Sequence, residues 1–275
     1  MQDLKNKVVL VSGAGGGIGA ALAQEAGLRG ARVVVTDVRG EAAEAVCEEL
    51  RGAGSSAIGL MLDVTSADSW LAAVDEAERA LGPIDLLCSN AGVGPVMKPI
   101  LELPVDYLRW VLEVNLFGAV NGVKSIVPRM VARGEGHVLV TASVAGFASG
   151  PLLSGYNASK HALIAVCESL RAELSATGVG LSVVCPAAVE TSLRTSTLEV
   201  MPQTMARALV TPSENTEAAI SDLAASAGGV MSAREVAQRA LDGVQAGQFY
   251  IFTHRDSRAM ALARDEEVRA AFERS

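Results

Sequence analysis

Residues 7–20 read Lys-Val-Val-Leu-Val-Ser-Gly-Ala-Gly-Gly-Gly-Ile-Gly-Ala. The apolar first half is typical of a strand buried on both faces of a parallel sheet, where side chains do not alternate between core and solvent. The glycine-rich second half leads directly into a helix predicted over residues 20–28. Glycines let the backbone approach a pyrophosphate closely, and a helix N-terminus offers it N–H groups and a partial positive charge. The stretch therefore favours a dinucleotide-binding turn over a plain tight connection.

The glycines of this turn fit two spacings. Gly15, Gly17 and Ala20 match Gly-x-Gly-x-x-Ala, the longer-chain dinucleotide fingerprint. Gly13, Gly17 and Gly19 match a pattern with three residues between the first two glycines. The turn by itself leaves both registers open.

Downstream of this turn, short β-branched runs alternate with longer Ala- and Leu-rich runs of helical period. The strands are predicted at residues 8–11, 32–37, 57–62, 85–88, 137–141, 181–185 and 249–252. One helix between successive strands specifies right-handed crossovers and a parallel sheet. We therefore predict an α/β fold over residues 1–254: a single doubly wound, Rossmann-type domain with a parallel seven-stranded sheet and helices on both faces.

Residues 190–230 interrupt this rhythm with a long segment rich in Thr, Ser, Met and Ala. Such segments are usually lids or disordered linkers, and the position just after a strand's carboxyl end favours a substrate lid. Helical period resumes over residues 232–246, where Ser232 and Glu235 fit a capping box. Residues 255–275 are predicted to form a charged helical tail, which either covers a neighbouring subunit's site or is solvated.

The composition argues against several classes of function. Hydrophobic residues make up 50% of the chain and aromatic residues 4%, so the core is expected to consist largely of Ala, Val, Leu and Ile. A net charge of −8 without a basic run argues against a nucleic-acid partner. The first residues carry charges and no apolar run is long enough to cross a bilayer, so we expect a cytoplasmic protein with no membrane partner. A small molecule is the expected ligand.

The four cysteines are widely scattered, with no Cys-x-x-Cys pair and no nearby histidine, so we expect buried apolar residues and no metal site. They are Cys47, Cys88, Cys167 and Cys185. The histidines His137, His161 and His254 are interpreted as packing or interface residues.

Asp37 ends the second predicted strand. A carboxylate there can accept hydrogen bonds from the adenosine ribose hydroxyls, and it would repel a 2′-phosphate. Arg39 complicates this interpretation, although it is not adjacent to the acid and could equally be a solvated loop charge. The sequence therefore favours NAD over NADP as the cofactor.

The segment 154–161 reads Ser-Gly-Tyr-Asn-Ala-Ser-Lys-His and opens a helix predicted to reach about Ala176. Tyr156 and Lys160 then stand one turn apart on the same face. A phenol has an ordinary pKa of about 10, and a nearby ammonium group favours the phenolate. Ser143 ends the fifth predicted strand, where its hydroxyl could bond a substrate oxygen. The three groups are expected to converge on one carbonyl.

In this order and spacing, the motifs resemble those of the short-chain dehydrogenase/reductase family, over almost the whole chain to about Phe252. The resemblance implies a catalytic set of Asn115, Ser143, Tyr156 and Lys160. It implies a cofactor-binding set of Gly13, Gly17, Ile18, Gly19, Asp37, Asp63, Val64, Asn90, Ala91, Gly92, Tyr156, Lys160, Pro186, Val189 and Thr191. Taken singly, Asp63 could instead cap the following helix and Asn90 could be an ordinary turn residue.

The resemblance also implies a mechanism. Tyr156 takes the alcohol proton while hydride passes to C4 of the nicotinamide. Lys160 lowers the pKa of that tyrosine and holds the nicotinamide ribose. Ser143 stabilises the developing oxyanion, and Asn115 anchors a water that relays the proton.

One position departs from the family pattern. The usual Pro-Gly after the sixth strand is Pro186-Ala187 here, and the extra methyl group would narrow the floor beside the nicotinamide or shift the loop. The departure puts the substrate's shape in doubt and leaves the chemistry intact.

The expected substrate is an apolar secondary alcohol, aromatic and alicyclic ones included, or the matching ketone. Six apolar residues could line its pocket or could simply pack the lid. They are Met97, Leu153, Leu193, Leu198, Met201 and Met205.

Two other functions stay open on the sequence. The chain could be a regulatory or scaffold protein that binds a nucleotide without turnover, or an isomerase, dehydratase or epimerase that retains its nucleotide. We expect a homodimer or homotetramer, because residues 105–131 and 156–176 offer apolar helix faces and the family commonly pairs these helices.

Overall fold

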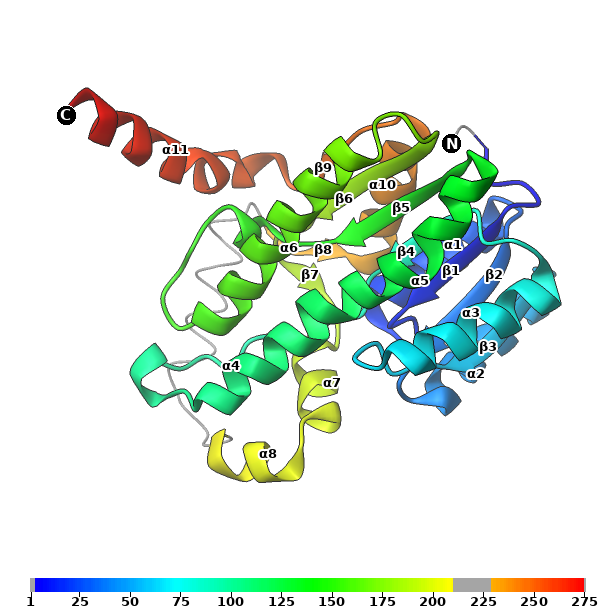
Figure 1. Ribbon diagram of the computed structural model, residues 1–275. Helices are drawn as coiled ribbons and strands as arrows, with labels where there is room; N and C mark the ends of the chain where they lie inside the picture. Colours follow the sequence, from blue (N-terminus) through cyan, green and yellow to red (C-terminus); the bar gives the residue numbers. More distant parts are fainter. Residues whose placement is uncertain (1–2, 210–228, 275) are drawn as a thin grey trace.

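The computed structural model describes residues 3–209 and 229–274, and its centre is a parallel seven-stranded sheet (Figure 1). The strand order is β3-β2-β1-β4-β5-β6-β9, which confirms the predicted doubly wound topology. Every predicted strand is present, with ends shifted by at most two residues. The bounds are β1 Val8–Ser12, β2 Arg32–Asp37, β3 Ala57–Met61, β4 Leu86–Ser89, β5 Gly136–Thr141, β6 Val179–Cys185 and β9 Tyr250–Phe252.

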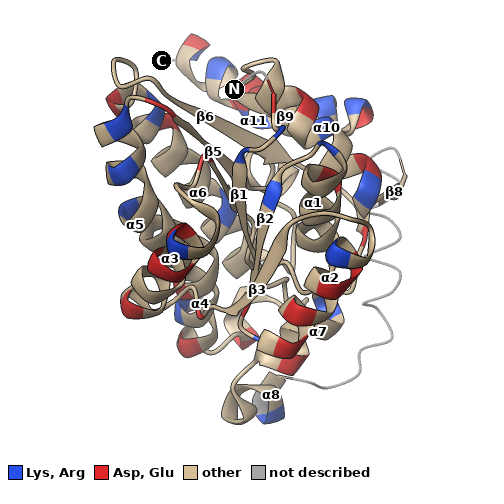
Figure 2. Ribbon diagram, turned by 90° about the vertical axis from the view of Figure 1, so that its right-hand side faces the viewer, with Lys and Arg blue, Asp and Glu red and all other residues tan. Residues whose placement is uncertain are grey.

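Helices cover both faces of the sheet. One face packs against α1 Gly17–Leu28, α2 Gly40–Gly52 and α10 Ala233–Gln245. The other packs against α3 Ala67–Leu81, α5 Gly118–Arg133 and α6 Ser154–Glu173. Charged residues lie mainly on helices and loops, and the strands are mostly uncharged (Figure 2).

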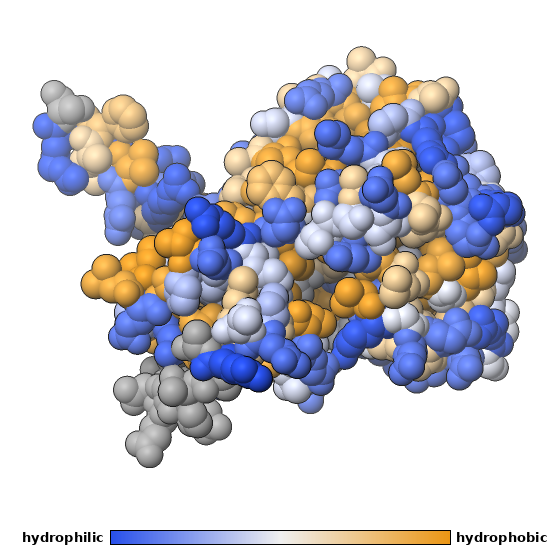
Figure 3. All heavy atoms as spheres, turned by 60° about the horizontal axis from the view of Figure 1, so that its bottom comes forward, coloured by the Kyte–Doolittle hydropathy of each residue, from blue (hydrophilic) through white to orange (hydrophobic). Residues whose placement is uncertain are grey.

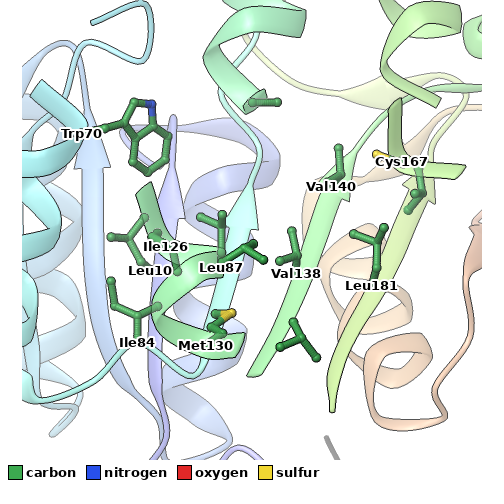
Figure 4. Close-up of a cluster of buried hydrophobic side chains, with 14 of the residues drawn as sticks. Leu10, Trp70, Ile84, Leu87, Ile126, Met130, Val138, Val140, Cys167 and Leu181 are labelled. Atoms are coloured by element: carbon green, nitrogen blue, oxygen red, sulfur yellow. The ribbon is translucent and has the colours of Figure 1, made fainter. Parts of the chain in front are cut away.

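The core explains the continuous apolar strands. In β1, Val8 and Leu10 face one core cluster while Val9 and Val11 face the other, and all four are fully buried. Each such side chain stabilises the fold by about 1.5–3 kcal/mol. Trp70 belongs to the same cluster as Leu10, Leu87 and Ile126 (Figure 4). The four cysteines are buried, as predicted.

Short elements surround the carboxyl edge of the sheet. They are η1 Ile100–Glu102, α4 Val105–Leu112, the π-helical turn η2 Glu113–Phe117, η3 Val144–Gly146, α7 Leu193–Val200 and α8 Gln203–Leu209. A small parallel sheet joins β7 Val189–Glu190 to β8 Met231–Ser232. Residues 210–228 of the predicted lid lie outside the described residues.

Helix α10 begins where its capping residues predict. The hydroxyl of Ser232 accepts a hydrogen bond from the N–H of Glu235 at 3.2 Å. The Glu235 side chain pairs with Arg239 one turn later, so only the first half of the predicted capping box is formed.

The predicted tail forms η4 Arg255–Ser257 and helix α11 Arg258–Glu273. Within these described residues, α11 buries no side chain, and it stands away from the main body (Figure 3). Which of its two expected roles it plays stays a prediction. Within residues 3–209 and 229–274, no helix combines the length and apolar character needed to cross a membrane.

Candidate active site

A cavity of about 440 Å³ lies at the carboxyl edge of the sheet, where the loops that follow the central strands meet. Most residues predicted for cofactor binding and catalysis line it. They are Gly13, Gly17, Ile18, Asp37, Asp63, Val64, Asn90, Ala91, Gly92, Ser143, Tyr156, Lys160, Pro186, Val189 and Thr191. Gly19 and Asn115 lie behind this lining.

The backbone distinguishes the two glycine registers. Gly13 and Gly17 have φ angles of +63° and +56°, in the left-handed region that glycine tolerates. A Cβ atom on Gly19 would lie 2.1 Å from the carbonyl oxygen of Gly13. At Gly15, in the other register, a Cβ atom would meet side chains rather than backbone. The pattern Gly13, Gly17, Gly19 is therefore the one that the fold demands.

Asp37 is buried at the end of β2, and its carboxylate is held by the adjoining loops. It accepts hydrogen bonds from the N–H groups of Gly15 and Arg39, both at 3.0 Å. Arg39 is partly exposed but paired. Its Nε lies 3.5 Å from Asp37 Oδ1, and its Nη1 lies 2.7 Å from a carboxylate oxygen of Glu199 on α7. The guanidinium is thus paired with two carboxylates.

Asn90 is not an ordinary turn residue, and Asp63 is not a helix cap. Asn90 donates through Nδ2 to the Ser12 carbonyl at 3.1 Å and accepts from the Thr141 hydroxyl at 3.1 Å, so it joins the ends of β1, β4 and β5. Asp63 does not cap α3, because that cap is formed by the Ser66 hydroxyl. Its carboxylate accepts from the N–H and hydroxyl of Thr65.

Ser143, Tyr156 and Lys160 come together at the end of β5 and the first turns of α6. Lys160 Nζ donates to the Thr141 carbonyl at 2.9 Å and lies 5.7 Å from the centroid of the Tyr156 ring. The Ser143 hydroxyl donates to the Pro186 carbonyl at 3.2 Å. The three predicted groups therefore share one wall of the cavity.

Burial governs the titration of this set. It raises the pKa of Tyr156 above its ordinary value, and a hydrogen bond with Ser143 partly opposes the rise. Burial also lowers the pKa of Lys160, to about 8. The sequence predicts that lysine lowers the pKa of this tyrosine, whereas in the structure burial raises it. The physical reason is that the interior disfavours the charged form of both groups.

Asn115 lies within the π-helical turn, a form that often marks functional sites. Its Oδ1 accepts from the Val93 N–H at 2.7 Å, and its Nδ2 donates to the Val93 carbonyl at 3.0 Å and to Ser159 Oγ at 3.1 Å. The side chain thus fixes the loop after β4. The expected water relay stays a prediction.

Two further residues that support the site were missed in the sequence. Ser159 lies between Tyr156 and Lys160 in the quoted motif, and its hydroxyl donates to the Tyr156 carbonyl at 2.7 Å. Its position three residues after the tyrosine, on the same helix face, could have indicated it. Thr197 of α7 accepts from the Gly94 N–H at 2.7 Å, and no local signal marks it.

Helices α4 and α7 and the π-helical turn also line the cavity. Their lining residues include Trp110, Glu113, Val114, Leu193, Ser196 and Val200. Of the predicted pocket residues, Leu193 lines the cavity. Leu198, Met201 and Met205 instead pack in a cluster with Tyr107, so for them the lid-packing interpretation is right.

The residues present fit a dinucleotide. A Cβ atom at Gly13 would lie 2.6 Å from Ala91 Cα, so the turn before α1 can present only backbone to the cavity at this point. The N-terminal end of α1 follows directly, and the Asp37 carboxylate lies in the same cavity wall. This combination suits a pyrophosphate and a ribose hydroxyl pair.

Comparison with known proteins gives consistent relatives. Residues 7–201 match the family model described as short chain dehydrogenase. A 1-deoxy-11-beta-hydroxypentalenate dehydrogenase from Streptomyces avermitilis is 35% identical over 256 residues, which cover 92% of this chain and 87% of that protein. A C alpha-dehydrogenase from Sphingobium is 36% identical over 194 residues, covering 70% and 64%. The crystal structure of a short chain dehydrogenase/reductase from Burkholderia phymatum in complex with NAD has a TM-score of 0.90 and 33% identity, covering 98% and 97%.

Proposed function

Because this chain belongs to the short-chain dehydrogenase/reductase family, we propose that Tyr156 is the general acid/base of an NAD-dependent alcohol dehydrogenase acting on apolar secondary alcohols. The family and its dehydrogenase relatives show the coarser part, an oxidoreductase that uses a nicotinamide cofactor. One observation carries the finer part. Ser143, Tyr156 and Lys160 line the same cavity as the glycine turn and Asp37.

A bound nicotinamide would supply the site that accepts or donates hydride. In alcohol oxidation, the Tyr156 oxygen takes the hydroxyl proton, and in ketone reduction it returns that proton to the carbonyl oxygen. Ser143 can turn its hydroxyl from the Pro186 carbonyl toward the substrate oxygen. Lys160 is held by the Thr141 carbonyl beside the tyrosine ring, where its positive charge favours the phenolate.

The choice of NAD over NADP is supported by the end of β2. The Asp37 carboxylate is buried and fixed by two backbone N–H groups, so it cannot easily move away from a 2′-phosphate. Arg39 already pairs with Asp37 and with Glu199, which limits its availability to a phosphate.

The apolar substrate is supported by the side chains that α4, α7 and the π-helical turn contribute to the cavity lining. Trp110, Val114, Leu193 and Val200 offer apolar surface there, and Glu113 would repel an anionic group. An alcohol without a carboxylate near the reacting carbon fits this lining.

A homodimer or homotetramer remains part of the proposal. An apolar groove of about 470 Å³ lies between α5 and α6, lined mainly by Ala, Val and Leu side chains. These are two of the helices predicted to pair between subunits. Light scattering would give the mass, and a monomer would contradict the assembly while leaving the chemistry untouched.

The test is NADH formation by the wild type and by Tyr156→Phe across aliphatic, aromatic and alicyclic secondary alcohols, repeated with NADP. We expect turnover with NAD that is lost in the folded variant. Bound nucleotide that copurifies without net turnover on any alcohol would favour an isomerase, dehydratase or epimerase instead.

A further inference from the structure

The loop 186–189 lines the cavity directly after β6. Its first carbonyl accepts a hydrogen bond from Ser143 Oγ at 3.2 Å, and the Ala188 carbonyl accepts one from the Met231 N–H at 3.0 Å. The Ala187 N–H lies beyond the last bonds of the sheet, at a half-buried position, and its hydrogen bond is made by a side chain.

His254, two residues after the end of the neighbouring strand β9, supplies that hydrogen-bond partner. Because β9 runs parallel beside β6, the residues that follow the two strands meet at the sheet edge. His254 Nδ1 accepts from the Ala187 N–H at 3.3 Å, and Nε2 lies 3.0 Å from the Ala188 carbonyl oxygen. The Thr253 hydroxyl lies 2.8 Å from the same Nδ1. The imidazole is buried, at 6% exposure.

These partners determine which ring nitrogen carries the proton. An amide N–H can only donate and a carbonyl can only accept. Nδ1 is therefore the acceptor and Nε2–H the donor, which defines one neutral tautomer. A second proton on Nδ1 would turn it into a donor and leave the Ala187 N–H without its acceptor.

The surroundings of the ring favour this neutral state. Burial lowers the pKa of His254 from its ordinary 6.5, while the bond to the Ala188 carbonyl raises it. Two charged groups of α10 act on the ring: Arg239 lowers its pKa and Glu235 raises it, and the two pair with each other at 2.6 Å. On the η4 side, the hydroxyl of Ser257 donates to the His254 carbonyl.

We propose that His254 is a positioning residue whose neutral imidazole holds the loop 186–189 in the conformation that a nicotinamide nucleotide needs. This rests on the proposed function, because the loop borders the cavity assigned to that nucleotide. The sequence suggested packing or an interface for His254, and its contacts assign a narrower role. They also fix the backbone at Ala187, the position where the chain departs from its family.

The first experiment needs no ligand. In the ¹⁵N-labelled full chain, we expect the His254 ring to show the Nε2–H tautomer, and the Ala187 amide signal to shift when that ring is protonated at acidic pH. An Nδ1–H tautomer, or an Ala187 amide signal that does not shift as His254 is protonated, would contradict the hydrogen bond from Ala187 to His254. This measurement tests the contact between His254 and Ala187 even if neither NADH nor NADPH binds, a result that would instead refute the proposed function.

The second experiment measures NADH dissociation constants by fluorescence from about pH 8 to about pH 5. His254→Phe keeps a ring and removes both nitrogen partners, so binding should weaken roughly tenfold or more at neutral pH. His254→Asn offers a neutral amide in place of Nδ1. It should retain more affinity and abolish the weakening that the wild type shows as His254 becomes protonated.

A matched control is His137→Asn, which replaces a buried histidine of β5 bonded to Ser182. It should lower the melting temperature without changing NADH affinity or its pH profile. If His254→Phe fails to fold, His254→Asn and the wild-type profile carry the test. Equal affinities and equal profiles for the wild type and His254→Asn would overturn the proposal.

Discussion

The two ends of the cavity are built in different ways. At the nucleotide end, hydrogen bonds join neighbouring strand ends directly, as where Ser12 Oγ accepts from the N–H groups of Asn90 and Ala91. Helices α4, α7 and α8 form what we call the substrate end, because the alcohol is proposed to bind beside them, and they associate mainly through the apolar cluster around Tyr107 and Met201. Hydrogen bonds fix direction whereas apolar burial does not, so the first end is specified more tightly than the second.

The largest expected effect tests whether proton transfer depends on a residue of the hydrogen-bonded nucleotide end. Tyr156→Phe should lower kcat about 10² to 10⁴-fold, because proton transfer by a positioned group is worth that much. NADH affinity and Tm should change little. Tyr250→Phe is the control, since that hydroxyl bonds Glu168 away from the cavity. Substantial activity in Tyr156→Phe would mean that another group moves the proton.

A large effect is also expected from the glycine turn. Gly19→Ala places a methyl group against the Gly13 carbonyl, so the turn must deform and NADH binding should weaken roughly a hundredfold. Gly52→Ala is the control, because a Cβ atom there meets no described atom within 4 Å. Isothermal titration with NADH compares the two. Equal binding would show that the nucleotide end adapts as readily as the substrate end.

The titration of Tyr156 gives a third test. Since burial raises its pKa, the phenolate is scarce at neutral pH and increases roughly tenfold per pH unit below that pKa. Alcohol oxidation under kcat/KM conditions should rise with pH, whereas ketone reduction should not. A flat oxidation profile from about pH 6 to about pH 9 would indicate that binding of the nucleotide lowers the phenol's pKa below this range.

Asp37→Ser should weaken the preference for NAD over NADP about tenfold. The substitution removes the carboxylate that would repel a 2′-phosphate and releases Arg39 from one of its partners. The ratio of kcat/KM for NADP to that for NAD should rise. Asp85→Asn provides the comparison, because this acid bonds the Val8 N–H at the opposite edge of the sheet. A similar change in both variants would exclude a specific role for Asp37.

The smallest expected effect separates the two ends most directly. Thr197→Val keeps the side-chain shape and removes the hydroxyl that accepts from the Gly94 N–H, so the KM for alcohol should rise about fivefold. NADH affinity should stay the same. Thr177→Val removes a comparable hydroxyl bond to Val179 at 3.3 Å, far from the cavity, and should change neither value. Loss of NADH affinity in Thr197→Val would show that the ends are coupled.

The sequence predicts the nucleotide end well because the sequence patterns that mark it are local. The continuous apolar run at residues 8–11 and the acid at Asp37 each follow from their own strand and its end. The order of the strands follows from the spacing of the helices between them. Local patterns of this kind survive folding, because neighbouring residues in the chain remain neighbours in space.

What the sequence does not predict depends on distant partners. Arg39 forms an ion pair with Glu199 of α7, and Thr197 accepts a hydrogen bond from Gly94. No spacing in the chain predicts either pair. The same holds for His254 and Ala187. The direction of the Tyr156 pKa shift was missed for a related reason, since burial is a property of the whole fold.

The short pairing of β7 with β8 brings Glu190 beside Ser232 and so closes the intervening segment into a loop with adjacent ends. Doubling the length of a closed loop costs only about 0.6 kcal/mol in entropy. A change of length between these two strands therefore costs little loop-closure entropy. If this segment is the substrate lid that the sequence predicts, its length can change during evolution at little entropic cost, while the residues at the edge of the main sheet stay the same.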